Sequence, residues 1–304
     1  MTTLAPAPKE SRQVDLSSKS IGAVRNAKNR AATLAIAACL LVAAIPLGYV
    51  AYEVIARGGS SLSLEFLTSD IPRNYRVEGG GMAPAIVGTL TITGMAALMA
   101  LPVGILGAVY LNEYGKNSPL ARFIRMMSDV MTGVPSIVMG LFIYVVWVVN
   151  VGERNGFGGA LALACLMLPI VIRSAEEMLK LVPDEYRQAS AALGTPKWRT
   201  IMTVVLPSAS SGLTSGSLLA IARAAGETAP IIVTVGITYA VNPDLFAGGN
   251  TTLAAQIFGN ASQPFAGSTD RAWGAALTLI AIVFLFTLLA RFISARFSIE
   301  AKQG

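Results

Sequence analysis

The sequence contains no histidine, and this absence removes several classes of chemistry. Ser-His-Asp and Cys-His nucleophile systems both need an imidazole as their base, and most transition-metal sites use histidine as a ligand. The only two cysteines, Cys39 and Cys165, fall inside apolar stretches, where we expect them to pack as small apolar side chains without a disulfide. We therefore expect no catalytic residue, cofactor or metal in this chain.

Charged residues are also scarce. They make up 13% of the 304 residues, against 54% hydrophobic residues, which is too apolar for a soluble domain of this length. The only Gly-Lys pair, Gly115-Lys116, lacks the upstream glycine and the following Ser or Thr of a phosphate-binding loop. The chain is therefore predicted to lie in a membrane, and any uphill transport would need nucleotide hydrolysis by another chain.

Six apolar runs are long enough to cross a bilayer, which takes roughly 20 helical residues for a hydrocarbon core of about 30 Å. They are continuous, whereas barrel strands alternate, so we predict an all-α integral membrane fold with six helices. The first run is too long for a signal-peptide core and is expected to be retained. The predicted spans are 31–56, 83–111, 127–150, 158–180, 211–241 and 272–296.

The runs divide the chain into four regions. Residues 1–30 begin with a stretch rich in Pro, Ser and Thr and are expected to form a disordered tail. Residues 31–82 hold the first helix and an external loop, and 83–297 form the core with spans two to six. Residues 298–304 are a second short tail.

The basic residues predict the orientation, because loops on the cytoplasmic side carry an excess of lysine and arginine. Only Arg57, Arg73, Arg76, Arg154 and Arg271 fall on the opposite side, and Arg173 and Arg223 lie inside apolar runs. Both termini are therefore predicted to be cytoplasmic. The basic residues on that side are Lys9, Arg12, Lys19, Arg25, Lys28, Arg30, Lys116, Arg122, Arg125, Lys180, Arg187, Lys197, Arg199, Arg291, Arg296 and Lys302.

The segment 182–207, "VPDEYRQASAALGTPKWRTIMTVVLP", has clear helix punctuation. Pro183 suits a first helical position, and Gly194 is a natural stop. Thr195 can then cap a second short helix that Pro196 starts. The pattern predicts a helix, a sharp turn and a helix, which is either a surface connector or a contact site for another protein.

This segment resembles a known family. "YRQASAALGTPKWRTIMTVVLP" is similar to the cytoplasmic signature loop of ATP-binding-cassette importer permeases, in which Glu-Ala-Ala, three residues, Gly, nine residues and Ile-x-Leu-Pro recur. The resemblance implies that the loop docks into a groove of the ATPase subunit, although Gln188 replaces the usual glutamate. The residues to which it assigns this coupling role are Gln188, Ala189, Ser190, Leu193, Gly194, Thr195, Pro196 and Pro207.

Four further stretches resemble phosphate-specific importer permeases of the A type. They are "GTLTITGMAALMALPVGILGAVYLNEY" at 88–114, "GVPSIVMGLF" at 133–142, "LPIVIRSAEEMLKLVPDEYRQA" at 168–189 and "RAAGETAP" at 223–230. The resemblance implies a type I importer permease fold in a prokaryotic plasma membrane. The implied partners are a homologous C-type permease, two cytoplasmic ATPases and an external phosphate-binding protein. A permease for sulfate or molybdate remains an alternative, and so does an autonomous ion-coupled carrier.

Two charges interrupt the fifth apolar run. Arg223 lies about 16 Å along the helix from Gly212, near the bilayer midplane, where an isolated arginine costs a few kcal/mol at least. Glu227 follows one turn later on the same face. Arg223 can supply positive potential to an anion in transit, with Glu227 partly neutralising it, because the arginine fork matches oxyanion oxygens. Alternatively, the two form a static ion pair that braces the helix.

The same run contains helix breakers. Gly226 and Pro230 bracket Glu227 and Thr228, and proline frees backbone carbonyls, which is tolerated at membrane depth where the break is buried or lines a cavity. We therefore include Thr228 among the pathway residues. An adjacent stripe of small residues is expected to allow close packing on another transmembrane helix. It comprises Ser208, Gly212, Gly216, Ala220 and Ala224.

Arg173, in the fourth run, is the second candidate pathway residue. It lies about 22 Å from the outer end by helical rise, so its side chain can equally extend to the inner interface. Glu176 and Glu177 are expected to begin a solvated extension of that helix. Residues 242–271 are expected to form an external loop with a short re-entrant or surface helix.

Overall fold

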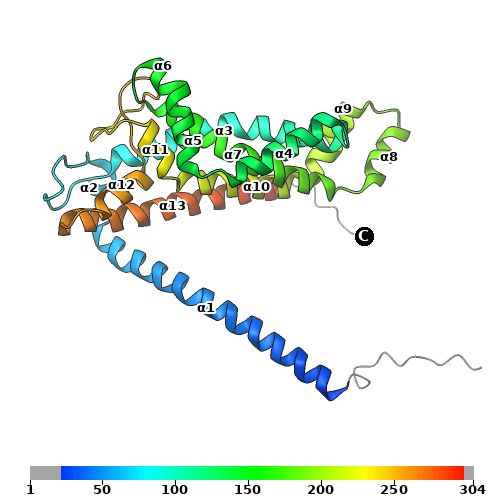
Figure 1. Cartoon of the computed structure of the whole chain (residues 1–304), viewed down its shortest axis with the longest axis horizontal. Helices are drawn as coiled ribbons and strands as arrows, with labels where there is room; N and C mark the ends of the chain where they lie inside the picture. The colour runs from blue at the N-terminus through cyan, green and yellow to red at the C-terminus, as the bar shows by residue number, and fades with distance from the viewer. Residues whose placement is uncertain (1–21, 298–304) are drawn as a thin grey trace, which may run out of the picture. The chain divides into compact units, whose positions relative to one another are not determined.

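The computed structural model describes residues 22–297, and over that range the chain is helical with no β-strand (Figure 1). The chain divides into two units, Met1–Glu53 and Val54–Gly304, and the boundary falls within the first helix. The helices are α1 (Ala23–Ser61), α2 (Leu64–Thr68), α3 (Ala83–Val109), α4 (Pro119–Gly133), α5 (Ser136–Ile143), α6 (Val149–Val151), α7 (Gly156–Lys180), α8 (Asp184–Ala192), α9 (Lys197–Thr200), α10 (Leu206–Ala225), α11 (Ala229–Thr234), α12 (Leu253–Ala261) and α13 (Ala266–Phe297).

Three π-helical turns extend these helices: Tyr110–Gly115 follows α3, Tyr144–Val148 joins α5 to α6, and Ile201–Val205 joins α9 to α10. The described part of the first unit is a single helix, Ala23–Glu53, whose apolar side chains have no other element of that unit to pack on. Helix α1 begins at Ala23, earlier than the expected start at residue 31. The rest of the expected tail, up to residue 21, lies outside the described residues, as does the C-terminal tail 298–304.

Five single helices are long and apolar enough to cross a membrane: Arg25–Ser61, Ala83–Gly115, Gly156–Lys180, Lys197–Ala225 and Ala266–Phe292. The expected third span, 127–150, is not one straight helix. It is a pair of helices, Pro119–Gly133 and Ser136–Val151, bent by 106°. Val134 takes an extended conformation, which a residue before proline prefers, and Pro135 starts the second helix.

The expected fifth span, 211–241, differs at both ends. A continuous helix begins at Lys197, passes through the π-helical turn and ends at Ala225, and α11 ends at Thr234. The second helix of segment 182–207 is therefore not a separate short helix, but the start of this span. A π-helical turn accommodates Pro207, which lacks the backbone N–H of a regular helix.

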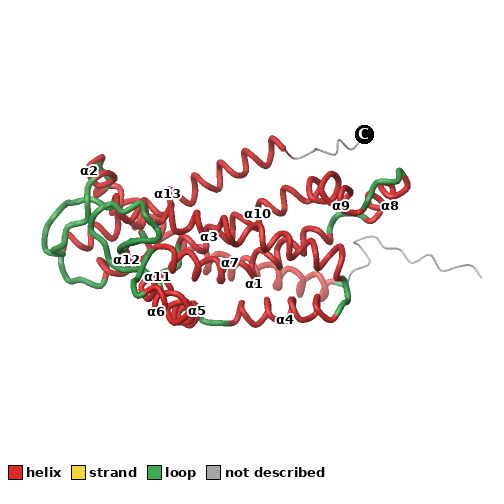
Figure 2. Tube along the Cα trace, turned by 90° about the horizontal axis from the view of Figure 1, so that it is seen from above, coloured by secondary structure: helices red, strands yellow, loops and turns green. Residues whose placement is uncertain are grey.

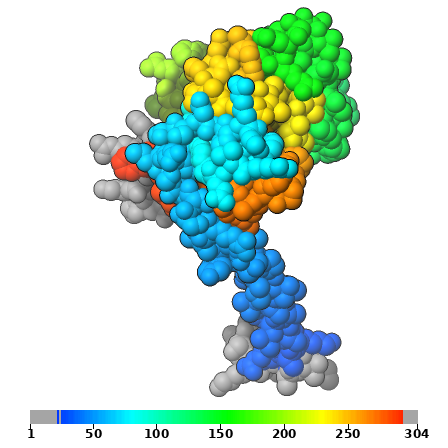
Figure 3. Space-filling model, turned by 90° about the vertical axis from the view of Figure 1, so that its left-hand side faces the viewer, coloured from blue at the N-terminus to red at the C-terminus, as the bar shows by residue number. Residues whose placement is uncertain are grey.

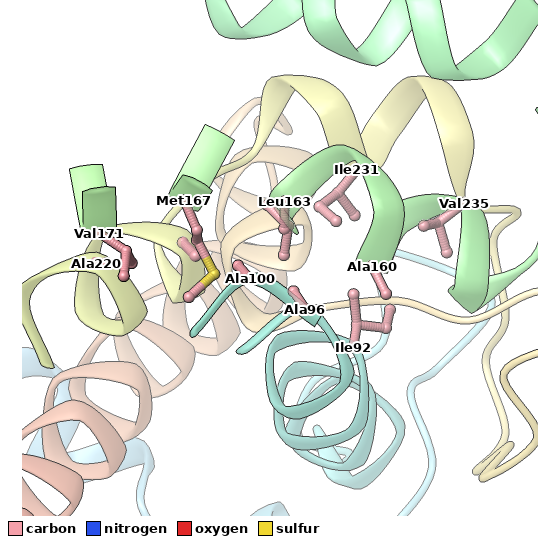
Figure 4. Close-up of a cluster of buried hydrophobic side chains, with 11 residues drawn as sticks. Ile92, Ala96, Ala100, Ala160, Leu163, Met167, Val171, Ala220, Ile231 and Val235 are labelled. Carbon is pink, nitrogen blue, oxygen red and sulfur yellow. The ribbon is translucent and has the colours of Figure 1, made fainter. Parts of the chain in front are cut away.

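The main core lies where α3, α7, α10 and α11 meet (Figure 4). Ile92 and Ala96 of α3 face Ala160 and Leu163 of α7, and small side chains let the two helix backbones approach closely. A Cβ atom on Gly104 would lie 2.6 Å from Cγ1 of Val171, so only glycine fits there. Such van der Waals packing holds helices together in lipid, where no hydrophobic gain remains between them.

Helices α8 and α9 lie at one end of the second unit, and α2 and α12 lie at the opposite end (Figures 1 and 2). At the α12 end, the cyan segment after α2 lies beside the yellow-to-orange segment that carries α12 (Figure 3). The backbone N–H of Ile71 donates to the carbonyl of Tyr239 at 2.9 Å and joins the two segments. The short helix expected within 242–271 is α12, and its buried Leu253 and Asn260 place it inside the packed helices, not on their surface.

Candidate functional site

Arg223 and Glu227 form a loose ion pair at the end of α10, in which the arginine is exposed and the carboxylate is partly buried. Arg223 lies in the last helical turn, and Glu227 follows the C-cap residue Gly226. The arginine Nε lies 3.7 Å from Glu227 Oε1, which is within ion-pair range but too long for a hydrogen bond. The side chain of Arg223 is 65% exposed and that of Glu227 is 19% exposed. Most of the guanidinium is therefore free to meet something outside this chain.

The small-residue stripe of α10 packs on α7 of the same chain. A Cβ atom on Gly212 would lie 2.3 Å from Met178 Sδ, and one on Gly216 would lie 2.5 Å from Ser174 Oγ. Farther along the stripe, Ala220 and Ala224 are buried in the main core. The expectation of close helix packing is therefore confirmed, and it fixes which face of α10 carries Arg223.

The break after α10 is held from two sides. Thr228 Oγ1 donates to the carbonyl of Ala254 in α12 at 3.4 Å. On the other side, a Cβ atom on Gly140 of α5 would lie 2.7 Å from Cα of Pro230. Irregular backbone at membrane depth requires this kind of protein surrounding. The conformation that presents Glu227 is therefore set by α5 and α12 as well as by its own segment.

The cavity that Arg223 and Glu227 line is very small. Its volume is about 10 Å³, and Leu166, Met167 and Ile170 of α7 close it. That space holds about one water molecule and no oxyanion. Any larger group that contacts the Arg223 guanidinium must therefore approach from its exposed side.

Arg173 does not line that cavity and has its own partner. Its Nε lies 3.3 Å from Asp129 Oδ1 of α4, and both side chains are partly exposed. Sequence reasoning missed Asp129, because the residue sits within a run that reads as one apolar span. The sequence did contain a sign of this pair: Asp129 is a lone carboxylate in one apolar run, and Arg173 is an arginine within the next.

At the α8 end, a second set of charges is tightly bound. Arg187 Nη2 donates to Glu113 Oε1 at 2.8 Å, and its Nε donates to the same oxygen at 3.1 Å. Arg187 also donates to the carbonyls of Val182 and Leu179 at 2.7 and 3.1 Å. Glu113 is buried in the π-helical turn after α3. The guanidinium therefore ties α8 to the ends of α3 and α7.

Glu176 does not begin a solvated extension, as the sequence suggested. Its side chain is 1% exposed, and its Oε1 lies 2.8 Å from both Arg125 Nε and Lys180 Nζ. The expectation failed because Arg125 comes from α4, far away in sequence, and covers this turn of α7. The neighbouring Glu177 is exposed, as expected.

The turn between α8 and α9 presents apolar side chains. Leu193 is 86% exposed, and Trp198 is also exposed, whereas Gly194 makes the turn with φ +76°. Gln188, Ala189 and Pro196 are exposed beside them, and Thr195 is partly buried. Two members of the predicted coupling set lie elsewhere: Ser190 is buried, with its Oγ 2.8 Å from Thr200 Oγ1, and Pro207 is half-buried within α10.

At the α12 end, Arg271 organises the loop after α2. Its guanidinium is buried and donates to the carbonyls of Tyr75 and Gly79 at 3.1 and 2.9 Å, and also to that of Val77. Sequence reasoning counted Arg271 only as a charge on the outer side. Its position in the first turns of α13 gave no sign of carbonyl partners almost 200 residues away.

A family model and related sequences place this chain in the same family of proteins. Residues 100–299 match the family described as binding-protein-dependent transport system inner membrane component. The chain is 43% identical over 281 residues to a Mycobacterium tuberculosis protein named phosphate transport system permease protein PstA 1, covering 90% of this chain and 91% of that one. It is 40% identical over 272 residues to the Yersinia pestis protein named phosphate transport system permease protein PstA, covering 90% and 92%.

Solved structures resemble the fold. The inward-facing methionine ABC transporter MetNI matches with a TM-score of 0.57 and 18% identity, over 71% of this chain and 93% of that one. An amino acid ABC transporter matches with a TM-score of 0.51 and 17% identity, again over 71% and 93%. At these identities the likeness concerns the fold alone.

Proposed function

Because this chain belongs to the family of binding-protein-dependent transport system inner membrane components, we propose that it is the permease subunit that forms half of the pathway of an ATP-driven importer for inorganic phosphate. The assignment of phosphate as the substrate rests on one observation. The chain is 43% identical, over 90% of its length, to a protein named as a phosphate transport permease. The apolar helices agree with a multi-pass protein of a prokaryotic inner membrane.

The ATPase activity belongs to partner subunits in this proposal. The α8–α9 turn presents Leu193, Gln188 and Ala189 to a cytoplasmic ATPase, and Gly194 and Pro196 shape the turn. Ser190 and Thr195 hold the two sides of the turn together, since Ser190 Oγ contacts Thr200 Oγ1 and the Thr195 N–H donates to the Ser190 carbonyl. Pro207 lies in the first turn of α10, within the continuous helix Lys197–Ala225, so movement of the α8–α9 turn is passed directly into the helix that carries Arg223.

Arg223 is the proposed substrate contact. Its exposed guanidinium faces away from the packed stripe, where a homologous partner permease would supply the opposite wall. Glu227 keeps the arginine positioned and partly neutralised, and the loose 3.7 Å pair can open when an oxyanion competes for the guanidinium. Thr228 fixes the break through α12, and Arg173, paired with Asp129, contributes positive potential along the pathway.

We propose the orientation that the basic residues predict. The α8 end and both termini face the cytoplasm, in agreement with the excess of basic residues in those segments. The loop after α2, held by Arg271, and the segment around α12 then face outward, where an external phosphate-binding protein delivers the substrate.

Uptake in cells tests this function. Cells that lack the gene are compared with cells complemented by the native chain, using radiolabelled phosphate, sulfate and molybdate in parallel. We expect only phosphate uptake to collapse on deletion and to return with the native chain. Loss of sulfate or molybdate uptake instead would keep the architecture and refute the substrate, and uptake by this chain without ATP would refute the importer.

A further inference from the structure

A pocket of about 310 Å³ lies at the α8 end, away from Arg223. It is bounded by the π-helical turn after α3, by α4, by the end of α7 and by α8. Four basic residues and two acidic residues line it, so that the lining carries a net charge of +2. We call it the basic pocket. Its charged residues are Lys116, Arg125, Lys180, Arg187, Glu113 and Asp184.

The acidic groups of the basic pocket are already neutralised. Glu113 is buried beneath Arg187, and Glu176 is buried behind Arg125 and Lys180. Asp184 is the one exposed carboxylate of the lining, and it pairs with Arg187 at 3.1 Å. With Glu176 included, the local charge is still +1. The charged groups of the pocket therefore sum to a net positive charge.

Two ammonium groups remain available on the open side. Lys180 is 53% exposed and uses Glu176 Oε1 as an acceptor, which leaves further N–H donors. Lys116 is exposed as well, and among the described residues its Nζ has no ion-pair partner. Asn112 and Asn117 add amide groups to the lining. These are the donors that an oxyanion requires.

The backbone at Lys116 is strained. Lys116 has φ +36°, and it is the only non-glycine residue with positive φ in the described part of the chain. Such a conformation costs about 1–3 kcal/mol and persists only where its surroundings impose it. One of these surroundings is Arg125, whose Nη1 donates to the Lys116 carbonyl at 2.7 Å. Arg125 thus lines the pocket and also holds the backbone of Lys116, another lining residue.

We propose that the basic pocket binds a phosphate-type oxyanion, held between Lys116 and Lys180. The volume accommodates a hydrated inorganic phosphate or the phosphate of an anionic lipid headgroup. Because Lys180 ends a candidate membrane span, both free phosphate and lipid headgroups can reach the pocket. Its occupant would join the turn before α4 to the end of α7, directly beneath Arg187. The anion would then stiffen the base of α8 and couple the α8–α9 turn more firmly to the spanning helices.

Local hydrogen exchange tests this site without reference to transport. The native complex that contains this chain is placed in nanodiscs of phosphatidylcholine, and exchange at residues 110–118 and 184–192 is followed with inorganic phosphate or with chloride at equal ionic strength. A second arm uses phosphatidylglycerol nanodiscs without phosphate. At ten times its dissociation constant, a ligand that binds only the closed form slows exchange through opening by about tenfold.

The variant Lys116→Gln/Lys180→Gln is expected to lose this protection, while Lys116→Arg/Lys180→Arg retains it. Neither variant changes Arg125, the other ion-pair partner of Glu176. Arg122→Gln is the matched control, since it removes one charge from exposed α4 surface outside the pocket. Arg223→Gln tests whether the protection depends on the proposed transport pathway, and we expect the protection to be kept in this variant.

Each outcome decides the proposal. Protection by inorganic phosphate in phosphatidylcholine assigns the site to a free anion. Protection only in phosphatidylglycerol assigns it to a lipid headgroup. No protection in either arm, or equal protection in the Lys→Gln double variant, overturns the site, and the proposed substrate of the importer would be unaffected.

Discussion

The chain holds its charges in two opposite ways at two places. At the end of α10, Arg223 is mostly exposed and meets Glu227 at 3.7 Å, with no hydrogen bond from its guanidinium to the described residues. At the α8 end, Arg187 is largely covered and donates to Glu113, Asp184 and the carbonyls of three residues. A loosely held charge can exchange partners at little cost, whereas a tightly held one transmits movement.

We therefore propose that the two places have different roles in transport. In the proposed function, the α10 end meets a passing anion, and the α8 end is a rigid joint between the α8–α9 turn and the spanning helices. The continuous helix Lys197–Ala225 connects the two places. Variants at the two places should consequently lose different properties: transport at the α10 end, and stability and ATP hydrolysis at the α8 end.

The largest effect is expected from Arg187→Gln. It leaves Glu113 buried with only the Asn112 amide and no arginine, and loss of one partner from a buried ion pair costs about 3–5 kcal/mol. We expect a lower melting temperature of the purified complex and loss of both phosphate uptake and ATP hydrolysis. Glu185→Gln, on the exposed side of the same helix, is the control. An unchanged melting temperature for Arg187→Gln would show that the joint is not rigid.

Arg223→Gln is expected to lower phosphate uptake by about tenfold or more, because a hydrogen bond to a charged group contributes about 1.5–3 kcal/mol. The melting temperature should change little, since the guanidinium is exposed and unbonded. Glu227→Gln should also slow transport, because the arginine would then hold the anion longer. Normal uptake rates in both Arg223→Lys and Glu227→Gln would refute the switching of this pair.

Gly216→Leu is expected to have an intermediate effect by moving α10 away from α7. Even a Cβ atom there would lie 2.5 Å from Ser174 Oγ, and overpacking costs about 1–3 kcal/mol. Lower yield of the folded chain and a reduced melting temperature should result. Ser215→Leu, on the neighbouring exposed position, should leave the melting temperature unchanged. Equal behaviour of the two variants would contradict the packing of this face.

The smallest effect is expected from Arg173→Gln. Its pair with Asp129 is partly exposed on both sides, and such pairs contribute about 0–1 kcal/mol. Phosphate uptake should fall no more than a few-fold, clearly less than for Arg223→Gln, and Asp129→Asn should match it. A collapse of uptake in Arg173→Gln with a normal Asp129→Asn would make Arg173 the main substrate contact instead.

Local features of the fold could be predicted from the sequence. The break around Gly226 and Pro230, the start of α8 near Pro183 and the turn at Gly194 follow from residues whose backbone preferences act within a few positions. Arg223 and Glu227 were also predictable as neighbours, because residues four apart share a helix face. The bend at Val134 could have been predicted in the same way from the proline that follows it. It was missed because residues 127–150 form one continuous apolar run.

Pairs between distant segments could not be predicted. Glu113 and Arg187 are 74 residues apart, and Arg125 and Glu176 are 51 apart, so their contact depends on how α3, α4, α7 and α8 pack. The burial of Glu176 and Ser190 depends on the same packing. Sequence periodicity reports which face of a helix is apolar, but it does not report which helix covers that face.

In the proposed mechanism the exposed Arg223 acts on the substrate, and the largely covered Arg187 acts on coupling. Both variants, Arg223→Gln and Arg187→Gln, would be reconstituted with their partner subunits in proteoliposomes, and phosphate transported and ATP hydrolysed would be measured together. We expect Arg223→Gln still to hydrolyse ATP while transporting little phosphate, whereas Arg187→Gln loses the ATP hydrolysis that the binding protein stimulates. The reverse pattern, or equal losses of both activities in the two variants, would contradict it.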